Sequence, residues 1–485
     1  MRCPWKASPW SCSNESTLTR NRRIDVRVLF ATAELSPIAR VGGLAEASAG
    51  LVRALRNAGL DVEVLVPDYG NIALDDEHVE HLALDPGFGN ARLRHGEVPG
   101  FGRVTLVDAP SLARPHPYLE PDTGQGWADN DRRFFTFANA IAKRVEQTEP
   151  DLVHLNDWHT AAMLGMATHR PPTVFTIHTI GYQGVTDASW IAQLPIHTQA
   201  FEWYGGVNPL AGAIQLADLV IAVSPTYARE IVTPSGGMGL DRLLAARGDR
   251  LVGIRNGIDT AVWDPTVDRY IAEHFDLAAP GGKAACRTAF LAELGWPDDT
   301  EPLVGMVTRL TEQKGIDLVF DTLQFLPTLP ARLAVLGAGD RATADSLRHA
   351  AAAMPDRLAF VEGYDNGLGH RIFGGCDLFL MPSRFEPCGL AQMQAMAYGA
   401  LPIVTDVGGL HDTVTDDDRA RGEGTGFVSR TVDAIGVVDA LHRAVRAARQ
   451  PSRRKAIARR GMQTDWSWTA PAAAHIAHYE ALLGR

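Results

Sequence analysis

The sequence lacks several features that would assign it to a specialised class of protein. No apolar run reaches the roughly 18–20 residues that a membrane-spanning helix needs. The five cysteines (Cys3, Cys12, Cys286, Cys376 and Cys388) are odd in number, scattered, and without the paired spacing of metal ligands. We therefore expect a reduced, cytoplasmic protein that does not contact a membrane.

The sequence also has fewer basic than acidic residues. The chain has 46 Lys and Arg residues against 57 Asp and Glu residues, which gives a formal net charge of −11. This balance argues against nucleic acid as the main partner, although a local basic cleft for phosphate remains compatible with it. Residues 1–23 lack the apolar core of a secretory signal, and we expect either a disordered leader or an upstream start included in error.

Short apolar, β-branched runs alternate with helical patterns along the rest of the chain. The first set of runs lies at residues 25–30, 62–66, 104–107, 152–155, 173–177 and 219–223, and the second at 303–307, 333–336, 358–361, 378–381 and 403–404. Strands separated by helices predict right-handed βαβ units and parallel sheets. Two such sets, in a chain of 485 residues, predict two doubly wound α/β domains.

We expect the boundary between the two domains near Trp263 and Pro265, after an Asn-Gly turn. The predicted domains are residues 24–264 and 265–464, followed by a helix within residues 465–485. Ligands of such sheets bind at the carboxyl ends of the strands, which is where the motifs described next fall.

The segment 384–390 (Arg-Phe-Glu-Pro-Cys-Gly-Leu) combines a carboxylate with a strand-to-helix turn. It follows the predicted strand 378–381 and precedes a helix predicted over residues 391–398. Backbone N–H groups at a helix start can hold a phosphate, and the helix dipole favours anions there. Glu386 would then meet a polar, partly cationic part of a substrate, unless it serves the helix dipole alone.

A second strand end, at residues 307–315, carries two cations before a helix predicted over residues 316–323. Arg309 offers a planar fork and Lys314 a flexible point charge, which are the two usual ways to hold a phosphate. Together with the Glu386 loop they predict a diphosphate clamp. The alternative is a pair of solvated cations at the rim of the sheet.

A glycine pair, Gly42 and Gly43, lies between the first predicted strand and a helix predicted over residues 45–57. Glycine lets the backbone approach a ligand that a Cβ atom would exclude. Many tight turns use the same pair, so this motif is weak alone.

Two charged segments are interpreted as solvated surface. They are the polar run 416–418 (Asp-Asp-Asp) and the arginine-rich helix over residues 443–460. No cluster of His, Cys, Asp or Glu has metal-ligand spacing, so we expect no metal site.

In order along the chain, these motifs resemble those of bacterial glycogen synthases and plant starch synthases. Residues 40–44 resemble the Lys-Thr-Gly-Gly-Leu signature of that family, and the similarity runs from about Val26 to residues 466–468. The other matching segments are 156–159, 175–178, 182–184, 223–228, 255–259, 308–310, 313–315, 336–340 and 382–390. The resemblance implies a retaining glycosyltransferase of the GT-B type, with two facing Rossmann-like domains, an active site in the cleft between them, and a last helix that returns to the first domain.

The resemblance also implies roles for individual residues. Glu386 would contact the donor sugar, while Arg309 and Lys314 would neutralise the leaving diphosphate. His178 and Asp157 would line the sugar and acceptor side, although a histidine at a strand end is often a core residue and Asp157 could instead be a helix N-cap. By contrast, His159 is expected to be structural.

Tyr364 matches a position at which the family stacks a nucleobase, and a loop-packing tyrosine is the alternative. Cys388 would contribute its backbone N–H rather than its thiol. The implied nucleotide-sugar contacts are Arg40, Gly42, Gly43, Arg309, Lys314, Tyr364, Cys388, Gly389 and Leu390. The turn at residues 408–410 resembles another close-approach turn near the donor.

The sequence departs from the family pattern at three positions of the first domain. Arg40 and Ala211 stand where the family has lysine, and Thr179 where it has asparagine. An exchange of Arg for Lys at a phosphate site is not neutral. Since the second-domain motifs are intact, the donor chemistry is better defined than the acceptor.

The sequence thus predicts a retaining α-glucosyltransferase that extends an α-1,4-glucan from a nucleotide-glucose without a cofactor or metal. ADP-glucose is the family's bacterial donor, and UDP-glucose is the alternative. The motifs are also compatible with a same-fold enzyme that uses a small-molecule acceptor, or with a catalytically weak glucan-binding protein. The oligomeric state does not follow from the sequence.

Overall fold

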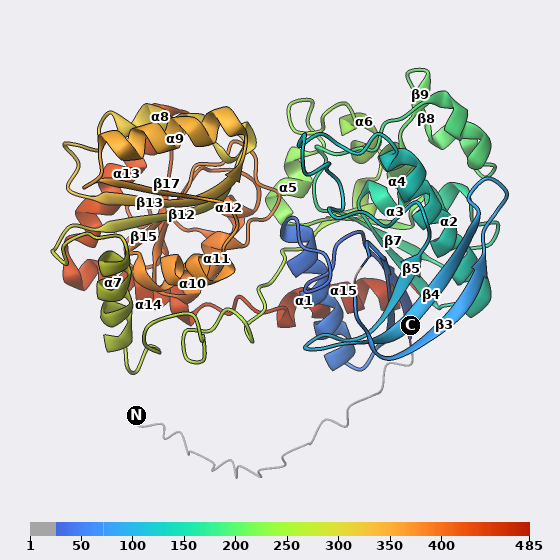
Figure 1. The fold of residues 1–485 in the computed structure, drawn as a ribbon, viewed down its shortest axis with the longest axis horizontal. Helices are drawn as coiled ribbons and strands as arrows, with labels where there is room; N and C mark the ends of the chain where they lie inside the picture. The colour runs from blue at the N-terminus through green and yellow to red at the C-terminus, as the bar shows by residue number, and fades with distance from the viewer. Residues whose placement is uncertain (1–25, 71) are drawn as a thin grey trace, which may run out of the picture.

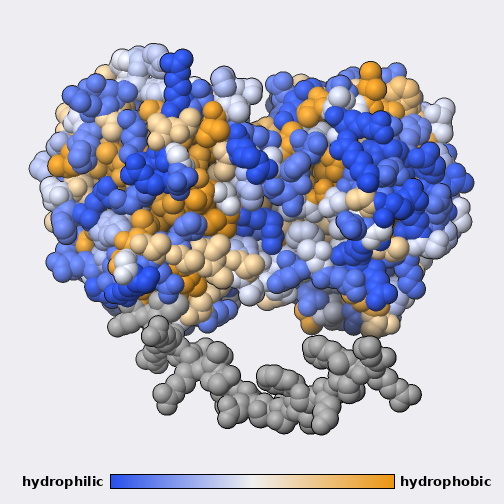
Figure 2. All heavy atoms as spheres, turned by 180° about the vertical axis from the view of Figure 1, so that it is seen from behind, coloured by the Kyte–Doolittle hydropathy of each residue, from blue (hydrophilic) through white to orange (hydrophobic). Residues whose placement is uncertain are grey.

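The computed structural model describes residues 26–70 and 72–485, and it consists of two α/β units that lie side by side (Figure 1). Each unit is built on its own sheet, and we call them the N-terminal and C-terminal domains. Seen from behind, they form two lobes with a notch between them (Figure 2). The predicted leader lies outside the described residues. The domain boundary near Trp263 stays a prediction. The segment around it lies between the last strand of the N-terminal sheet, which ends at Gly253, and the first strand of the C-terminal sheet, which begins at Leu303.

The N-terminal sheet is mixed. In sheet order, its strands are β11 (Leu251–Gly253), β10 (Leu219–Ala222), β7 (Thr173–Ile177), β6 (Leu152–Asn156), β1 (Arg27–Ala31), β2 (Asp61–Pro67), β5 (Gly102–Asp108), β4 (Asn90–Val98) and β3 (Asp75–Ala83). The strands from β11 to β5 are parallel, whereas β4 and β3 extend the sheet antiparallel. The sequence did not predict this hairpin, because the side chains of β3 are mostly exposed and form no apolar run.

Helices cover the two faces of this sheet. They are α1 (Gly43–Asn57), α2 (Asn130–Thr148), α3 (Trp158–Ala161), α4 (Pro209–Leu216), α5 (Pro225–Glu230) and α6 (Asp241–Ala245). The longest, α2, buries Phe134, Phe135 and Phe137 in the core. A separate two-stranded hairpin, β8 (Glu202–Trp203) and β9 (Gly206–Val207), lies outside the main sheet.

The C-terminal sheet is entirely parallel, as predicted. Its order is β14 (Leu358–Glu362), β13 (Arg332–Gly339), β12 (Leu303–Leu310), β15 (Leu378–Met381), β16 (Leu401–Val404) and β17 (Phe427–Val428). Its helices are α7 (Gly281–Glu293), α8 (Ile316–Leu323), α9 (Arg341–Ala353), α10 (Asn366–Gly375), α11 (Ala391–Ala397), α12 (Gly408–Thr413), α13 (Ala434–Ala448) and α14 (Pro451–Gln463). The observed bounds of α8 and β15 match the predicted ones.

The chain crosses between the domains twice, and the two crossings lie against each other. Gly257 on the first has no room for a side chain, because a Cβ atom there would lie 2.6 Å from the Ser467 carbonyl oxygen on the second. The last helix, α15 (Thr469–Leu482), packs on the N-terminal domain, where the Tyr479 hydroxyl lies 2.6 Å from Nδ1 of His154. Burial lowers the pKa of His154 well below its usual range, so this histidine is neutral in the fold.

The interpretation of the polar run 416–418 as a solvated loop is wrong. The Asp417 side chain is buried and forms ion pairs with Arg453 and Arg460, each at 2.7 Å. Arg443 is also buried, and it pairs with the first carboxylate of the run at 2.8 Å. The arginines on α13 and α14 that seemed a solvated face thus tie these helices to the loop after α12.

Replacing Asp417 by alanine should destabilise the protein, because it leaves two arginines without their shared carboxylate. We expect a loss of about 3 kcal/mol or more in the free energy of unfolding, at the low end for breaking a buried pair. Asp439→Ala is the matched control, since Asp439 pairs with Arg443 from a largely exposed position and should cost about 0.2–1 kcal/mol. Urea unfolding measures both variants; similar losses would contradict a structural role of the buried network.

Candidate active site

The carboxyl ends of the two sheets carry the predicted site residues. Asp157 follows β6 and His178 follows β7 in the N-terminal domain, while Arg309 lies near the end of β12 and Glu386 follows β15 in the C-terminal domain. The two edges touch: Oγ of Ser224 donates a hydrogen bond of 2.6 Å to the carbonyl of Pro387. The site is therefore assembled from both domains.

Glu386 and Lys314 are in direct contact. Nζ of Lys314 lies 2.5 Å from Oε2 of Glu386, and Oγ of Ser383 donates to the same oxygen at 2.9 Å. The Glu386 side chain is only 7% exposed. A buried carboxylate needs such a partner, so the cation predicted to bind phosphate also satisfies the carboxylate.

Two glycines make this contact possible. Gly315 has φ +67°, and a Cβ atom there would lie 2.0 Å from the Pro382 carbonyl oxygen. Gly408 has φ +43°, and its Cβ would lie 1.9 Å from the Glu386 carbonyl oxygen. Both turns therefore require glycine, and they bring the Lys314 loop and α12 against the Glu386 loop.

Arg309 is exposed, and Nη2 of its guanidinium donates to Oε1 of Gln313 at 3.2 Å. Gln313 in turn donates to the carbonyl of Phe385 at 3.2 Å, which connects the two predicted phosphate loops. Within the described residues Arg309 forms no ion pair, so its charge is available to a ligand.

Backbone donors complete the C-terminal side of the site. In the described part of the chain, the N–H groups of Gly389 and Leu390 meet no hydrogen-bond acceptor. Cys388 is buried, and burial raises the pKa of its thiol to about 12. Its thiol is therefore neutral, as expected for a residue whose side chain takes no part in the chemistry.

Asp157 is held in an unusual conformation. Its φ is +53°, and its buried carboxylate accepts hydrogen bonds from the backbone N–H groups of His178 at 2.7 Å and Thr179 at 3.4 Å. Asp157 stands at the N-cap position of α3, as the alternative predicted, but its side chain makes no capping hydrogen bond to that helix. Burial raises the pKa of Asp157 to about 7, against the opposing effect of those two hydrogen bonds. A strained backbone of this kind is common at functional sites.

His178 is neutral at pH 7, because burial lowers its pKa to about 3. Its Nε2 lies 2.9 Å from Oδ1 of Asn156, so Nε2 carries the proton and Nδ1 is the acceptor. Burial likewise lowers the pKa of His159 to about 3, and its ring packs between Tyr118 and Phe134. The structural role predicted for His159 agrees with this packing.

Sequence reasoning missed two residues of the site. The buried carboxylate of Glu34 accepts hydrogen bonds from the N–H groups of Val41 and Gly42, both at 2.8 Å, and from the Tyr118 hydroxyl at 2.8 Å. Burial raises the pKa of Glu34. Its place just after β1 was a detectable signal, whereas Tyr118 lies in a loop without any motif. The Gly42 N–H, expected to face a ligand, is here occupied by Glu34.

Arg40 spans the cleft. It forms a 2.9 Å ion pair with Glu46, and its guanidinium carbon lies 5.9 Å from the ring centre of Tyr364 in the other domain. Glu46 also accepts a hydrogen bond of 3.2 Å from Gln394 on α11. The Tyr364 residue is 75% exposed, so it is not packed within a loop. Gly43 meets the other domain too, since a Cβ atom there would lie 3.8 Å from Leu390.

The residues at the two other departures from the family pattern, Ala211 and Thr179, form hydrogen bonds with neighbouring residues. Ala211 is fully buried at the start of α4, where its N–H donates to Oδ1 of Asn208 at 3.0 Å. Oγ1 of Thr179 accepts a hydrogen bond of 3.3 Å from the N–H of Gly181. Neither leaves a buried polar group unpaired.

A cavity of about 540 Å³ opens on the N-terminal domain, and Trp158, the residue after Asp157, lines it. Its walls include Trp127, Trp158 and the loop 181–186. Gly184 lets this loop approach the indole, since a Cβ atom there would lie 2.1 Å from the Trp158 ring. The walls of the cavity therefore combine two indole rings with the backbone of the loop 181–186.

Residues 26–70 and 72–485 contain neither a metal site nor a membrane-spanning helix. In that part of the chain, no three His, Cys, Asp or Glu side chains are arranged to hold a metal ion. Within the same residues, no helix has the length and apolar character needed to cross a bilayer.

Comparison with known proteins finds matches over nearly the whole chain. The family model described as starch synthase catalytic domain matches residues 27–246, and that described as glycosyl transferases group 1 matches residues 292–461. A glycogen synthase of Acidiphilium cryptum is 40% identical over 480 residues, covering 95% of this chain and 100% of that protein. A glycogen synthase of Halorhodospira halophila is 41% identical over 474 residues, covering 94% and 99%.

Solved structures agree with these matches. The catalytic domain of starch synthase IV from Arabidopsis thaliana, bound to ADP and acarbose, superposes with a TM-score of 0.86 at 30% identity and covers 95% of this chain and 100% of that one. Sucrose-phosphate synthase from Thermosynechococcus elongatus has a TM-score of 0.62 at 19% identity, which shows the fold alone. The predicted GT-B fold is confirmed. The chain belongs to the family of bacterial glycogen synthases and plant starch synthases, and it is a glycosyltransferase.

Proposed function

We propose that the protein transfers glucose from ADP-glucose to the non-reducing end of an α-1,4-glucan, with retention of configuration. The observation that supports this proposal is the contact between the two sheet edges that carry the predicted residues. Arg309, Lys314 and Glu386 lie at strand ends of one domain, and Asp157 and His178 lie at strand ends of the other. A hydrogen bond from Ser224 to Pro387 joins the two edges. The glycogen synthases among its relatives, at about 40% identity, support the acceptor class. The ADP bound to the Arabidopsis enzyme supports ADP-glucose over UDP-glucose.

The donor diphosphate lies against the C-terminal domain. Arg309 and Lys314 neutralise its charge, which grows on the leaving group as the glycosidic bond breaks. The free N–H groups of Gly389 and Leu390 hold phosphate oxygens, and the base stacks on the exposed Tyr364 ring. Arg40 reaches the diphosphate from the opposite side of the cleft, together with the backbone of Gly43. Gly42, whose N–H is held by Glu34, contributes only the space that its missing side chain leaves.

Glu386 positions the donor sugar and stabilises positive charge at its anomeric carbon. The diphosphate competes with Glu386 for Lys314, so donor binding loosens the ion pair of the free enzyme. The freed carboxylate then faces the sugar. Asp157 and the Nδ1 atom of His178 accept hydrogen bonds from sugar hydroxyls on the N-terminal side.

We further propose that the reaction needs no metal ion, because two side-chain cations and two backbone donors are present where the diphosphate binds. We place the enzyme in the cytoplasm, on the sequence argument from its scattered cysteines. We take residues 24–264 and 265–464 as the two domains and the helix in 465–485 as part of the first.

A transfer assay tests the proposal as a whole. Purified protein should move radiolabelled glucose from ADP-glucose to glycogen, with UDP-glucose much poorer, and excess EDTA should leave the rate unchanged. Preference for UDP-glucose or for a small acceptor would replace the proposed substrates. Loss of rate on chelation, restored by magnesium or manganese, would overturn metal independence. Binding of glucan without any transfer would show that the protein is a glucan-binding protein and not an enzyme.

The diphosphate clamp is tested by Lys314→Ala and Arg309→Ala. Each should lower kcat by roughly a hundredfold or more, because each removes a charge that stabilises the leaving group. Arg348→Ala is the matched control, since Arg348 is an exposed, ion-paired arginine on α9. Near-normal kcat in either clamp variant, with folding unchanged by circular dichroism, would remove that residue from the clamp.

Arg40 gives a graded test of the N-terminal side. Arg40→Lys should keep measurable transfer because the charge is retained, whereas Arg40→Ala should lose roughly 1.5–3 kcal/mol of transition-state stabilisation, as for other charge-assisted contacts. The effect of each substitution is measured as the change in kcat/KM for ADP-glucose. If the parent and both variants were equally active, Arg40 would have no contact with the donor.

A further inference from the structure

The β8–β9 hairpin carries an aromatic side chain at its tip. It projects at the upper right of the N-terminal domain in Figure 1. Tyr204 in its turn is 95% exposed, and its ring contacts that of Trp203 edge-on, with the ring centres 5.1 Å apart. A tyrosine this exposed gains almost nothing from packing within the protein.

The hairpin is fixed to the wall of the 540 Å³ cavity. Thr186, which lines the cavity, exchanges two backbone hydrogen bonds of 2.9 and 3.0 Å with Val207 of β9. Gly206 passes so close that a Cβ atom there would lie 2.6 Å from the Thr186 carbonyl oxygen. Tyr204 is therefore held at a defined place relative to the cavity.

Exposed apolar side chains lie on the wall of this cavity and on the neighbouring loop that carries Met238. Tyr182 is 59% exposed, and Val185 and Met238 are also exposed large apolar residues. Nε2 of Gln183 donates to the Met238 carbonyl at 3.0 Å, which ties the two loops together. A group of this kind beside a cavity marks a binding surface rather than isolated surface residues.

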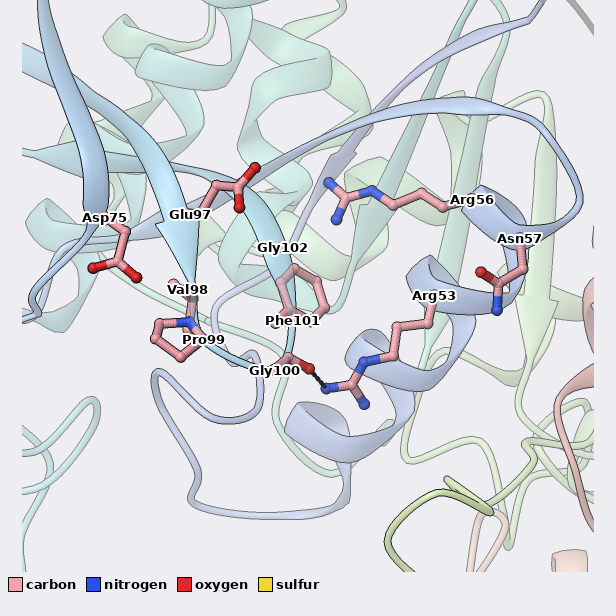
Figure 3. Close-up of a pocket in the computed structure, with 10 residues that line it drawn as sticks. All are labelled: Arg53, Arg56, Asn57, Asp75, Glu97, Val98, Pro99, Gly100, Phe101 and Gly102. Atoms are coloured by element: carbon pink, nitrogen blue, oxygen red, sulfur yellow. Dashed lines mark hydrogen bonds between the residues drawn. The ribbon is translucent and has the colours of Figure 1, made fainter.

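A second cavity, of about 410 Å³, does not offer the same chemistry (Figure 3). The guanidinium groups of Arg53 and Arg56 lie 5.4 and 5.3 Å from the ring centre of Phe101, and the Phe101 residue is buried. The aromatic residue that lines this cavity, Phe101, is thus buried and already paired with two cations. Tyr182, which lines the 540 Å³ cavity, is by contrast 59% exposed.

We propose that Tyr204 and Trp203 form an outer platform for the α-glucan acceptor, several glucose units away from the reacting end. The apolar C–H face of a glucose ring stacks on the electron-rich face of an aromatic ring. A rigid aromatic side chain loses little conformational entropy when it binds. The acceptor chain passes from Asp157 through the cavity walled by Trp158 and Tyr182 to this hairpin. This inference rests on the proposed function, since it names a further part of the same acceptor site.

The platform predicts an effect that depends on acceptor length. With saturating ADP-glucose, Tyr204→Ala should raise KM for maltoheptaose by roughly three- to tenfold, the loss expected for one aromatic stack. KM for maltotriose, kcat, and KM for ADP-glucose should stay unchanged, because these do not involve the hairpin. Tyr204→Phe should behave like the parent, since it keeps the ring. Ile435→Ala, at an 81% exposed position of the C-terminal domain, is the matched control.

A binding experiment separates this inference from the proposed function. Calorimetric titration with maltoheptaose, without donor, should show weaker binding by Tyr204→Ala than by the parent. If the parent transfers glucose but both proteins bind maltoheptaose equally, the platform is overturned and the proposed function stands. If the parent transfers no glucose, the proposed function fails, and a maltoheptaose affinity lost only in Tyr204→Ala still supports the platform. No maltoheptaose binding by the parent overturns it.

Discussion

The contact between Lys314 and Glu386 is the interaction on which the rest of the cleft depends. It places a cation and a carboxylate within one buried hydrogen-bonded group, and two glycines with positive φ keep the loops close enough to form it. A buried pair of this kind adds little net stability, but it fixes the position of both groups. The same atoms that order the free enzyme are those proposed to meet the donor, so the cleft is already arranged before the substrate enters.

Much of this organisation could be predicted from the sequence. The βαβ rhythm predicted both sheets, since buried parallel strands read as short apolar runs between helices. Motifs at strand ends predicted that Asp157 and His178 follow strands of one sheet, and that Arg309 and Glu386 lie at the ends of strands of the other, which is where the structure has them. The family signature then named the chemistry, which spacing alone could not do.

The remainder could not be predicted, for physical reasons. β3 is exposed along most of its length, and in β4 only Ala91, Leu93 and Val98 are buried, so neither strand forms a continuous apolar run. The run 416–418 looks solvated in sequence, and only the fold brings distant arginines to it. Tyr118 reaches Glu34 across 84 residues of chain, a contact that no local pattern encodes. In the last two cases, the contacts that decide the structure join residues far apart in the chain.

The packing of α15 on the N-terminal domain has a consequence for how the chain is made. A domain usually folds as a unit while the rest of the chain is still being synthesised. Here the partner of His154 is Tyr479, and Trp468 fills the space above Gly50. The N-terminal domain therefore cannot bury its last surface until α15 has been synthesised and has left the ribosome. The C-terminal domain is thus synthesised before the N-terminal domain can be completed, although the N-terminal domain comes first in the sequence.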